Sequence, residues 1–361
     1  MALKEVSMGA QLPNANKRAA IRPKAHLMPL PSKFDHRITA DPADPADPEN
    51  ASPKGGGPLA WLAQQFATAT SSSEVERDGQ FVRAQISKLG WYTRYFSPQI
   101  RGIQNLPKTG PVLVVGNHSC LYYMPDAWVE SLAVLARRGF ESKVYALGYD
   151  LLFAIPGIGD FLRKVGAIPA KGESAEAALQ EGALVIVYPG GDWEASRPWK
   201  DRNQIDFNGR KGFIRLALKA GVPIVPVVSH GAHDAIVIAS RGGKLAKAIG
   251  LNMLRIKVFP LLVGPPFGIN PLLVPLLPMP SAITVEFLPA ITWNEALPED
   301  SNDDQLVAQC YEEVTTAMQA ALTRLHDEYR HPVARGFSRL FTGQSMSDPV
   351  FRQSLEAAKS K

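Results

Sequence analysis

The sequence PVLVVGNHSCLYYMPDAWVESLAVLARRG, residues 111–139, decides the fold class. Residues 111–117 form an apolar run that is typical of a strand buried on both faces. Residues 125–139 have helical spacing, a proline at the first position, and two arginines and a glycine at the end, which are start and stop signals of a helix. The stretch therefore predicts one strand–helix unit.

The same alternation continues on the C-terminal side of this unit. The predicted strands lie at 143–147, 166–169, 183–189 and 222–228, and the predicted helices lie near 158–165, 173–181 and 209–220. Because strands alternate with helices, we expect an α/β fold: layered, with a largely parallel central sheet flanked by helices. A long helix over 303–328, capped by Ser301 or Asn302, follows.

The two ends of the chain differ from this middle part. Residues 1–75 hold nine prolines before Leu59, the repeat DPADPADPEN and a serine run, so we expect a disordered, Pro-rich N-terminal arm. Residues 76–329 are expected to form the domain. Residues 330–361 are a basic C-terminal tail, in which the pattern favours no element.

Composition narrows the class of protein. With 361 residues, 45% hydrophobic and 20% charged, the chain is globular and neither wholly disordered nor fibrous. Its two cysteines, Cys120 and Cys310, cannot form a disulfide framework and fit a reducing compartment. The N-terminus has no apolar run of signal-peptide length, and the net charge of +5 suits an anionic partner.

Two segments could contact a membrane. Residues 81–96 have helical spacing, with Trp91, Tyr92 and Tyr95 among basic residues, so this helix either lies on an anionic membrane surface or packs on the core. Residues 258–285 are 28 consecutive residues without a charge, but seven prolines forbid a regular transmembrane helix. We expect irregular apolar loops there, which either dip into the interfacial layer or close the core.

The first candidate for chemistry is His118, just past the C-terminal end of the first buried strand, where α/β sheets place ligands and catalytic groups. Its imidazole could be a general base if a carboxylate supported it. The nearest downstream carboxylate is Asp126, and eight helical residues would hold the two about 12 Å apart. The loop must therefore fold back, as Met124 before a proline favours. The alternative is a structural histidine.

The second candidate is the segment VIVYPGGDWEASRPW, residues 185–199, in which a strand ends in a glycine turn. Backbone N–H groups of such a turn can approach a ligand closely. Between residues 195 and 219 there are seven basic residues against two acidic ones. Guanidinium groups there would bind phosphates, unless the run is a solvated surface. The candidate ligand-binding residues are Asn117, Ser119, Pro189, Gly190, Gly191, Glu194, Arg197, Arg210 and Lys211.

The third candidate is HGAHD, residues 230–234, after the last buried strand. Two histidines with an aspartate beside them could belong to a metal site, but no clear further ligand is present. We therefore expect no metal, and a role for His233 at the rim of the site. The sequence lacks the G-x-S-x-G, P-loop, H-E-x-x-H and G-x-G-x-x-G motifs, which removes the commonest hydrolase, NTPase, zinc-protease and dinucleotide-binding classes.

The order of these blocks resembles the glycerolipid acyltransferases, the family of lysophospholipid and glycerol-3-phosphate acyltransferases. The matching blocks are NHSCLYYMPD (117–126), YPGGDWEA (188–195) and VPIVPV (222–227). The Pro-Gly-Gly form resembles the branch of type-2 diacylglycerol acyltransferases and their bacterial relatives. Three features depart from the family pattern: a His-x7-Asp instead of His-x4-Asp spacing, Gly190 in place of a glutamate, and a middle block, GAIPA (166–170), without arginine.

The resemblance implies a membrane-associated enzyme of lipid metabolism and phospholipid biosynthesis. His118, supported by Asp126, would deprotonate a hydroxyl of a lysophospholipid, monoacylglycerol or diacylglycerol, which would attack an acyl thioester. The donor would be acyl-CoA or an acyl carrier protein, with no other cofactor. Glu194 would replace the lost glutamate, and Arg197, Arg210 and Lys211 would receive the donor's phosphates. We expect a peripheral or monotopic protein on the cytoplasmic face of the membrane, and no nucleic-acid partner.

Two other functions remain open at this stage. The departures from the family pattern would suit a non-catalytic lipid-binding or lipid-transfer protein with the same pocket. A phosphoesterase that uses the histidines with a metal is the other.

Overall fold

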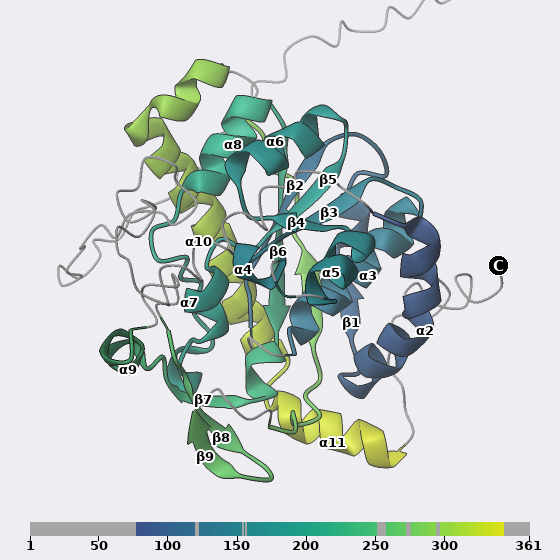
Figure 1. Ribbon diagram of the computed structural model, residues 1–361, viewed down its shortest axis with the longest axis vertical. Coiled ribbons are helices and arrows are strands. Elements are labelled where there is room, and N and C mark those ends of the chain that lie inside the picture. The colour runs from purple at the N-terminus through teal and green to yellow at the C-terminus, as the bar shows by residue number, and fades with distance from the viewer. Residues whose placement is uncertain are drawn as a thin grey trace, which may run out of the picture. The chain divides into compact units, whose positions relative to one another are not determined.

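The computed structural model describes residues 77–119, 123–153, 155, 157–250, 258–271, 276–293 and 297–342 (Figure 1). The predicted N-terminal arm lies outside these residues. The strands are β1 Gln99–Arg101, β2 Val112–Gly116, β3 Val144–Gly148, β4 Ala167–Pro169, β5 Leu184–Val187, β6 Ile224–His230, β7 Val237–Ser240, β8 Leu261–Gly264, β9 Gly268–Pro271 and β10 Thr284–Phe287. The α-helices are α2 Gly79–Tyr95, α3 Pro125–Arg138, α4 Asp150–Phe153, α5 Ile158–Val165, α6 Gly172–Gln180, α7 Gly191–Ala195, α8 Gly212–Ala220, α9 Gly243–Ala248, α10 Asp304–Glu328 and α11 Pro332–Thr342.

The central sheet has seven strands in the order β1-β10-β6-β2-β5-β3-β4. All neighbouring pairs are parallel except β10 and β6, which are antiparallel. The predicted α/β fold with a largely parallel sheet is therefore confirmed. All five residues of β2 and all seven of β6 are buried, which explains why both strands read as continuous apolar runs.

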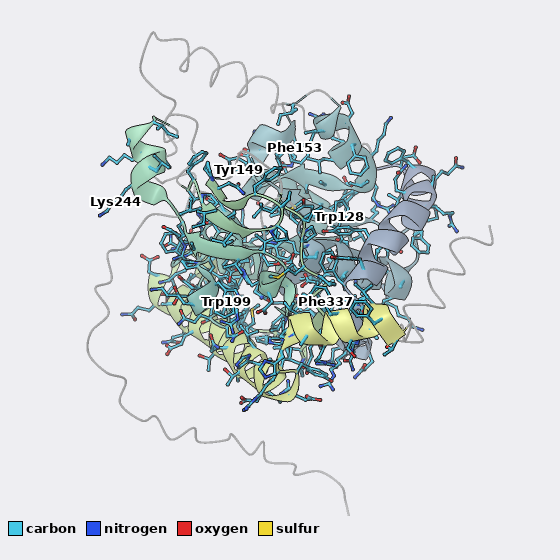
Figure 2. All side chains as sticks on the ribbon, turned by 90° about the horizontal axis from the view of Figure 1, so that it is seen from below. Trp128, Tyr149, Phe153, Trp199, Lys244 and Phe337 are labelled. Atoms are coloured by element: carbon cyan, nitrogen blue, oxygen red, sulfur yellow. The ribbon has the colours of Figure 1, made fainter. Side chains whose placement is uncertain are left out.

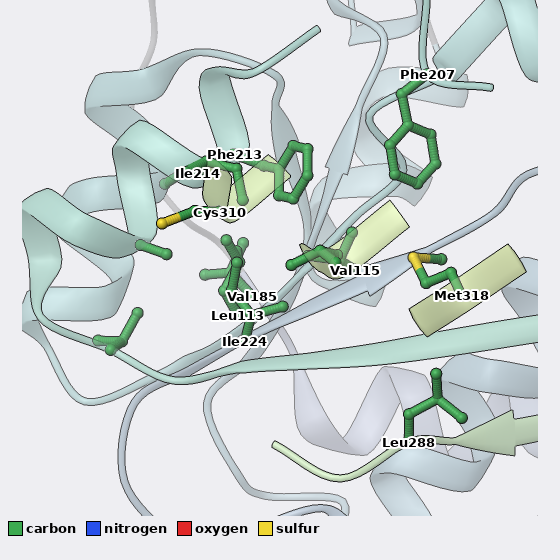
Figure 3. Packing of buried hydrophobic residues seen from close by; sticks show 14 of the residues in the cluster. Leu113, Val115, Val185, Phe207, Phe213, Ile214, Ile224, Leu288, Cys310 and Met318 are labelled. Atoms are coloured by element: carbon green, nitrogen blue, oxygen red, sulfur yellow. The ribbon is translucent and has the colours of Figure 1, made fainter. Parts of the chain in front are cut away.

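Helices cover both faces of this sheet. Leu113 and Val115 of β2 pack with residues of α6, α8 and α10. Val112 and Val114, which alternate with them, pack on the opposite face with residues of α2 and α3. Figure 3 shows the first of these clusters, in which Met318 of α10 lies near the strands. The helix predicted over residues 81–96 therefore contributes to the core, although its membrane contact remains a prediction.

The apolar segment after α9 differs from the prediction of irregular loops. It contains the antiparallel hairpin β8–β9, which pairs with β7 to form a second sheet of three strands. The prolines do not prevent this pairing, because Pro265 and Pro266 lie in the turn and Pro271 ends β9. Among the described residues, we find no helix with both the length and the apolar composition required to cross a bilayer.

Two further details correct or extend the sequence analysis. The N-cap of α10 is Asp303, whose side chain accepts hydrogen bonds from the backbone N–H groups of Gln305 and Leu306. The predicted caps, Ser301 and Asn302, belong to a short 3-10 helix at 298–302 instead. The C-terminal tail, for which no element was expected, carries helix α11.

Candidate active site at the carboxyl ends of three strands

The three candidate segments meet at one edge of the central sheet. β2 lies between β5 and β6 and is parallel to both. The carboxyl ends of these strands therefore lie side by side, and residues 117–119, 188–191 and 231–234 follow them directly. In open α/β sheets this edge is where ligands and catalytic groups collect.

His118 and Asp126 are in contact at this edge. The Nδ1 atom of His118 lies 3.2 Å from the Oδ2 atom of Asp126, and the same carboxylate oxygen accepts the backbone N–H of Ser119 at 2.6 Å. The chain folds back because Met124 has a positive φ of 40° before Pro125 starts α3. Asp126 is fully buried in the first turn of α3, where the helix dipole favours a negative charge. The longer His-x7-Asp spacing thus permits a histidine–carboxylate pair.

The electrostatics of this pair suit a base. Burial by itself would lower the pKa of His118, but the Asp126 carboxylate, its hydrogen bond and Glu194 outweigh burial and raise this pKa. When the neutral ring donates Nδ1–H to Asp126, Nε2 carries the basic lone pair. The His118 side chain keeps 11% of its surface exposed, so the ring is not sealed inside the protein.

Asn117 has a structural role in this arrangement. Its side-chain amide donates to the backbone oxygen of Ser229 at 3.0 Å, and its carbonyl accepts the Ser229 N–H at 2.7 Å. Asn117 therefore ties the end of β2 to β6 and fixes the start of the His118 loop. A contact between this amide and substrate remains a prediction.

The glycine turn after β5 brings Glu194 against the His118 loop. One carboxylate oxygen of Glu194 accepts the backbone N–H of His118 at 3.2 Å, and the other binds Arg197. Gly190 permits this fold, because a Cβ atom there would lie 2.1 Å from the Cγ of Glu194. Burial raises the pKa of Glu194, while Arg197 opposes this rise. Glu194 is thus close to the predicted base, although it contacts its backbone and not its ring.

The predicted phosphate-binding residues divide into two groups. Arg197 is fully buried and paired with Glu194. Arg210 is also buried; it donates to the backbone oxygen of Gly190 at 2.7 Å and pairs with Asp192 at 2.9 Å. Both guanidinium groups therefore have internal partners, and their phosphate contacts stay predictions. Lys211, at the N-cap of α8, makes no ion pair with any described residue, so its phosphate contact stays a prediction.

His233 lies behind the predicted base and not at a rim. It is buried, and its ring is hydrogen-bonded to the backbone of His118. Burial, with the nearby charges of Arg197 and His118, holds the pKa of His233 well below its ordinary value, so the ring is neutral. His230 points elsewhere: its ring packs edge-on against His326, with 5.6 Å between the ring centres. The two histidines of HGAHD thus lie in different surroundings.

Glu130 and Tyr188 also belong to the site, although neither was predicted from the sequence. The Tyr188 hydroxyl donates to the Glu130 carboxyl at 2.6 Å, and the Tyr188 ring stacks on His118, with 4.7 Å between the ring centres. Burial, followed by repulsion from Asp126, raises the pKa of Glu130 well above its ordinary value and favours its protonated form. The available signal was an acid four residues after Asp126, which places both carboxyl groups on the same face of the predicted helix.

Several polar atoms around His118 have no hydrogen-bond partner among the described residues. They are Ser119 Oγ, Asp126 Oδ1, Glu130 Oε1, His233 Nε2, and Nε and Nη1 of Arg197. Buried polar atoms are usually paired. A histidine base supported by a carboxylate, within such a polar environment, can accept a proton from an alcohol.

Comparison with known proteins gives the chemical class. Residues 97–230 match the family model described as acyltransferase. An uncharacterised protein of Mycobacterium tuberculosis is 28% identical over 268 residues, which cover 73% of this chain and 72% of that protein. The DGAT1/2-independent enzyme synthesizing storage lipids of Bos taurus is 29% identical over 136 residues, which cover 38% of this chain and 39% of the relative.

One solved structure is also similar: the 1-acyl-sn-glycerophosphate acyltransferase of Thermotoga maritima, with 16% identity, a TM-score of 0.43, and coverage of 73% of this chain and 88% of that one. The family model spans the strands that end in the His118 loop and in the glycine turn, and it ends at His230. The part of the chain that carries the candidate site therefore matches the acyltransferase family.

Proposed function

We propose that this protein transfers a fatty acyl group from an acyl thioester to a hydroxyl of a glycerolipid, with His118 as general base. The donor is acyl-CoA or an acyl carrier protein, and the acceptor is a lysophospholipid, a monoacylglycerol or a diacylglycerol. No cofactor is required besides the donor. The observation that carries the proposal is the 3.2 Å contact between His118 Nδ1 and Asp126 at the carboxyl end of β2.

The proposed reaction has two steps and no acyl-enzyme. Nε2 of His118 takes the proton of the acceptor hydroxyl while the hydroxyl oxygen attacks the thioester carbonyl carbon. The tetrahedral intermediate then collapses, the carbon–sulfur bond breaks, and the imidazolium returns its proton to the leaving thiolate. Asp126 stabilises the imidazolium between the two steps.

The backbone around the base favours one productive geometry. Asn117, Glu194 and His233 each contact the backbone or flanking strand of the His118 loop, and Tyr188 covers one face of the ring. The loop backbone is therefore restrained by these residues, and the ring itself is restrained by Asp126 and Tyr188, as catalysis by a positioned base requires. The glycine turn at 190–191 and Ser119 are the proposed contacts of the reacting carbonyl and the acceptor.

The Bos taurus relative, named as an enzyme that synthesises storage lipids, supports a lipid acceptor. We propose that the acceptor is presented by a membrane on the cytoplasmic side. This acceptor is a hydroxyl in a lipid and not a free small alcohol, which distinguishes the proposal from acyl transfer in general.

The test is thioester consumption by the purified chain with acyl-CoA and acyl-loaded carrier protein. Each donor is offered with lysophospholipid, monoacylglycerol and diacylglycerol acceptors, and products are identified by mass spectrometry. His118→Ala should lower the transfer rate by about 10²–10⁴-fold, because a positioned base contributes about that much. His331→Asn, a change at an exposed histidine with a positive φ of 60°, is the matched control and should leave the rate unchanged.

Two results would contradict the proposal. Full transfer activity in His118→Ala would remove the assigned base. Lipid binding by the wild-type chain without thioester loss, across all donors and acceptors, would favour the lipid-binding alternative.

A further inference from the structure

Helix α11 exposes its apolar side and buries its small and polar side. Phe337, Leu340 and Phe341, which share one helix face by their i, i+3, i+4 spacing, are 44% to 86% exposed. Figure 2 labels Phe337 on this helix. A surface helix of a globular protein ordinarily has the opposite orientation, with its apolar stripe toward the core.

The contacts of the opposite face hold α11 in this orientation. Gly336 lies so close to the backbone of Pro280 that a Cβ atom would be 1.8 Å from the Pro280 oxygen. Arg339, which is buried, donates to the backbone oxygen of Ser97 at 2.8 Å. A rotation that buried the phenyl rings would break both contacts. These two contacts therefore fix the helix with its apolar face exposed.

The β8–β9 hairpin adds exposed apolar side chains at the same end of the molecule. Phe267 and Ile269 on the hairpin, and Leu277 beyond it, are 59% to 69% exposed. Leu277 donates its N–H to Pro265 in the hairpin turn at 2.9 Å. Pro280, three residues later, packs on Gly336 of α11. Figure 1 shows α11 and the hairpin together at the lower end of the view.

We name these six exposed side chains the apolar end: Phe267, Ile269, Leu277, Phe337, Leu340 and Phe341. The sequence segments that carry the apolar end contain basic but no acidic residues. Residues 258–285 contain no charged residue, and residues 330–342 contain three arginines and no acid. Arg339 is buried and Arg330 pairs with Asp327, so Arg335, which lies over the Tyr329 ring, is the arginine without an acidic partner among the described residues. The nearest acids before this segment, Asp327 and Glu328, are paired with Arg330 and Arg101. Aromatic and aliphatic side chains beside arginines are what binding at an anionic lipid interface requires.

The apolar end is also connected to the candidate active site. Tyr123 lies in the loop between His118 and Asp126, and its hydroxyl donates to the backbone oxygen of Leu276. Its ring packs against the cluster that Leu276 forms with Ile238 and Leu262. The loop that carries the proposed base is therefore bound to the segment that bears Leu277.

We infer that the apolar end inserts into the interfacial layer of an anionic lipid membrane and that the acceptor reaches His118 from there. This inference rests on the proposed function, because it supplies the surface through which that site would meet a membrane-borne acceptor. Two separate elements, a helix and a hairpin, expose apolar side chains without a compensating acid. A lipid surface accommodates both, whereas a protein partner would need a shape complementary to each.

The experiment measures partition of the full chain onto sedimented vesicles of phosphatidylcholine with 30% phosphatidylglycerol. The pair Phe337→Ser with Phe341→Ser, and the pair Phe267→Ser with Ile269→Ser, should each lower the partition coefficient at least about tenfold, because inserted phenyl and alkyl groups are lost. The matched control is Leu297→Ser, since Leu297 is 56% exposed but precedes the N-terminal end of α10, about 37 Å of helix from α11. The control should bind like the wild type.

Each outcome has a defined meaning. Equal partition of the wild type and both variant pairs would overturn the inference, as would a wild-type dimer that the variant pairs abolish without a change in vesicle binding. Equal binding of the wild type to vesicles of pure phosphatidylcholine would show that an anionic lipid is not required. With a water-soluble short-chain acceptor, the variant pairs should keep wild-type activity. If the variant pairs lose vesicle binding and neither they nor the wild type transfer an acyl group, the membrane-binding surface is supported and the proposed function is wrong.

Discussion

Two regions of the molecule depart from the usual distribution of side chains, in which charged groups are exposed and apolar groups are buried. The edge formed by β2, β5 and β6 buries ionisable groups, including Asp126, Glu130, Glu194 and Arg197. The apolar end exposes phenyl and alkyl groups to solvent. Buried charge costs folding free energy unless it is paired, whereas exposed apolar surface costs little beyond the burial it forgoes. The edge of the sheet is therefore held together by paired charges that depend on one another. At the apolar end, by contrast, single side chains can be removed without loss of the fold.

The largest expected effect is on the buried pair of Arg197 and Glu194. Arg197→Met would leave the Glu194 carboxylate in the interior without its cation, and breaking a buried pair in this way costs about 3–5 kcal/mol. Urea denaturation would measure this loss as a change in the free energy of unfolding.

The matched change is Arg83→Met. Arg83 pairs with Glu141 at 3.2 Å on the surface, and loss of such a pair costs at most about 1 kcal/mol. Equal destabilisation by the two substitutions would contradict the distinction between the buried edge of the sheet and the protein surface.

A second expectation concerns how Glu130 links stability to pH. Its folded-state pKa lies above its ordinary value of 4.5, so the unfolded chain releases this proton first as pH rises. The folded state then binds more protons than the unfolded state, and stability falls with rising pH until Glu130 ionises in the folded protein. Glu130→Gln removes this dependence and keeps an acceptor for the Tyr188 hydroxyl. Relative to the wild type, the variant should gain up to about 1.4 kcal/mol for each pH unit above 4.5 over which wild-type Glu130 stays protonated.

The measurement is the free energy of unfolding of both proteins from pH 5 to pH 8. Parallel curves would show that Glu130 has no raised pKa. Tyr188→Phe separates the hydrogen bond from the titration, because it removes the hydroxyl and leaves the Glu130 carboxyl in place.

The smallest expected effect is at the apolar end. Phe337→Ser and Phe341→Ser should each change the free energy of unfolding by no more than about 0.5 kcal/mol, because surface substitutions rarely do more. Phe207→Ala, at a fully buried ring, should cost about 3–5 kcal/mol. Strong destabilisation by the α11 substitutions would mean that this face is covered in the folded protein.

The sequence alone predicted those strands and helices that have a clear hydrophobic periodicity. The strand at 111–117 and the helix at 125–139 appear as β2 and α3, because buried strands and capped helices have local signals. The contact of His118 with Asp126 was expected because Asp126 is the nearest downstream carboxylate and because Met124 before a proline favours a loop that folds back. The β8–β9 hairpin was not predicted, because seven prolines obscured two short strands whose pairing is a tertiary property.

Other features of the site depend on tertiary contacts that sequence does not encode locally. Arg197 and Arg210 belong to a basic run that reads as a ligand-binding surface, yet both fold inward onto Glu194 and Asp192. Glu130 reads as an ordinary helix residue, and only the packing of Tyr188 on His118 shows its place beside the base. The orientation of α11 likewise depends on the close approach of Gly336 to Pro280.

The most direct test of the central claim is the pH dependence of kcat/KM for acyl transfer by the wild type and by Asp126→Asn. The rate should rise with pH as His118 loses its proton. Removal of the carboxylate should lower the pKa of His118, because burial still disfavours the imidazolium, so the acidic limb should move to lower pH while the maximal rate falls by about 10²-fold or more. An Asp126→Asn profile that matches the wild type in both position and height would show that this carboxylate does not support the base.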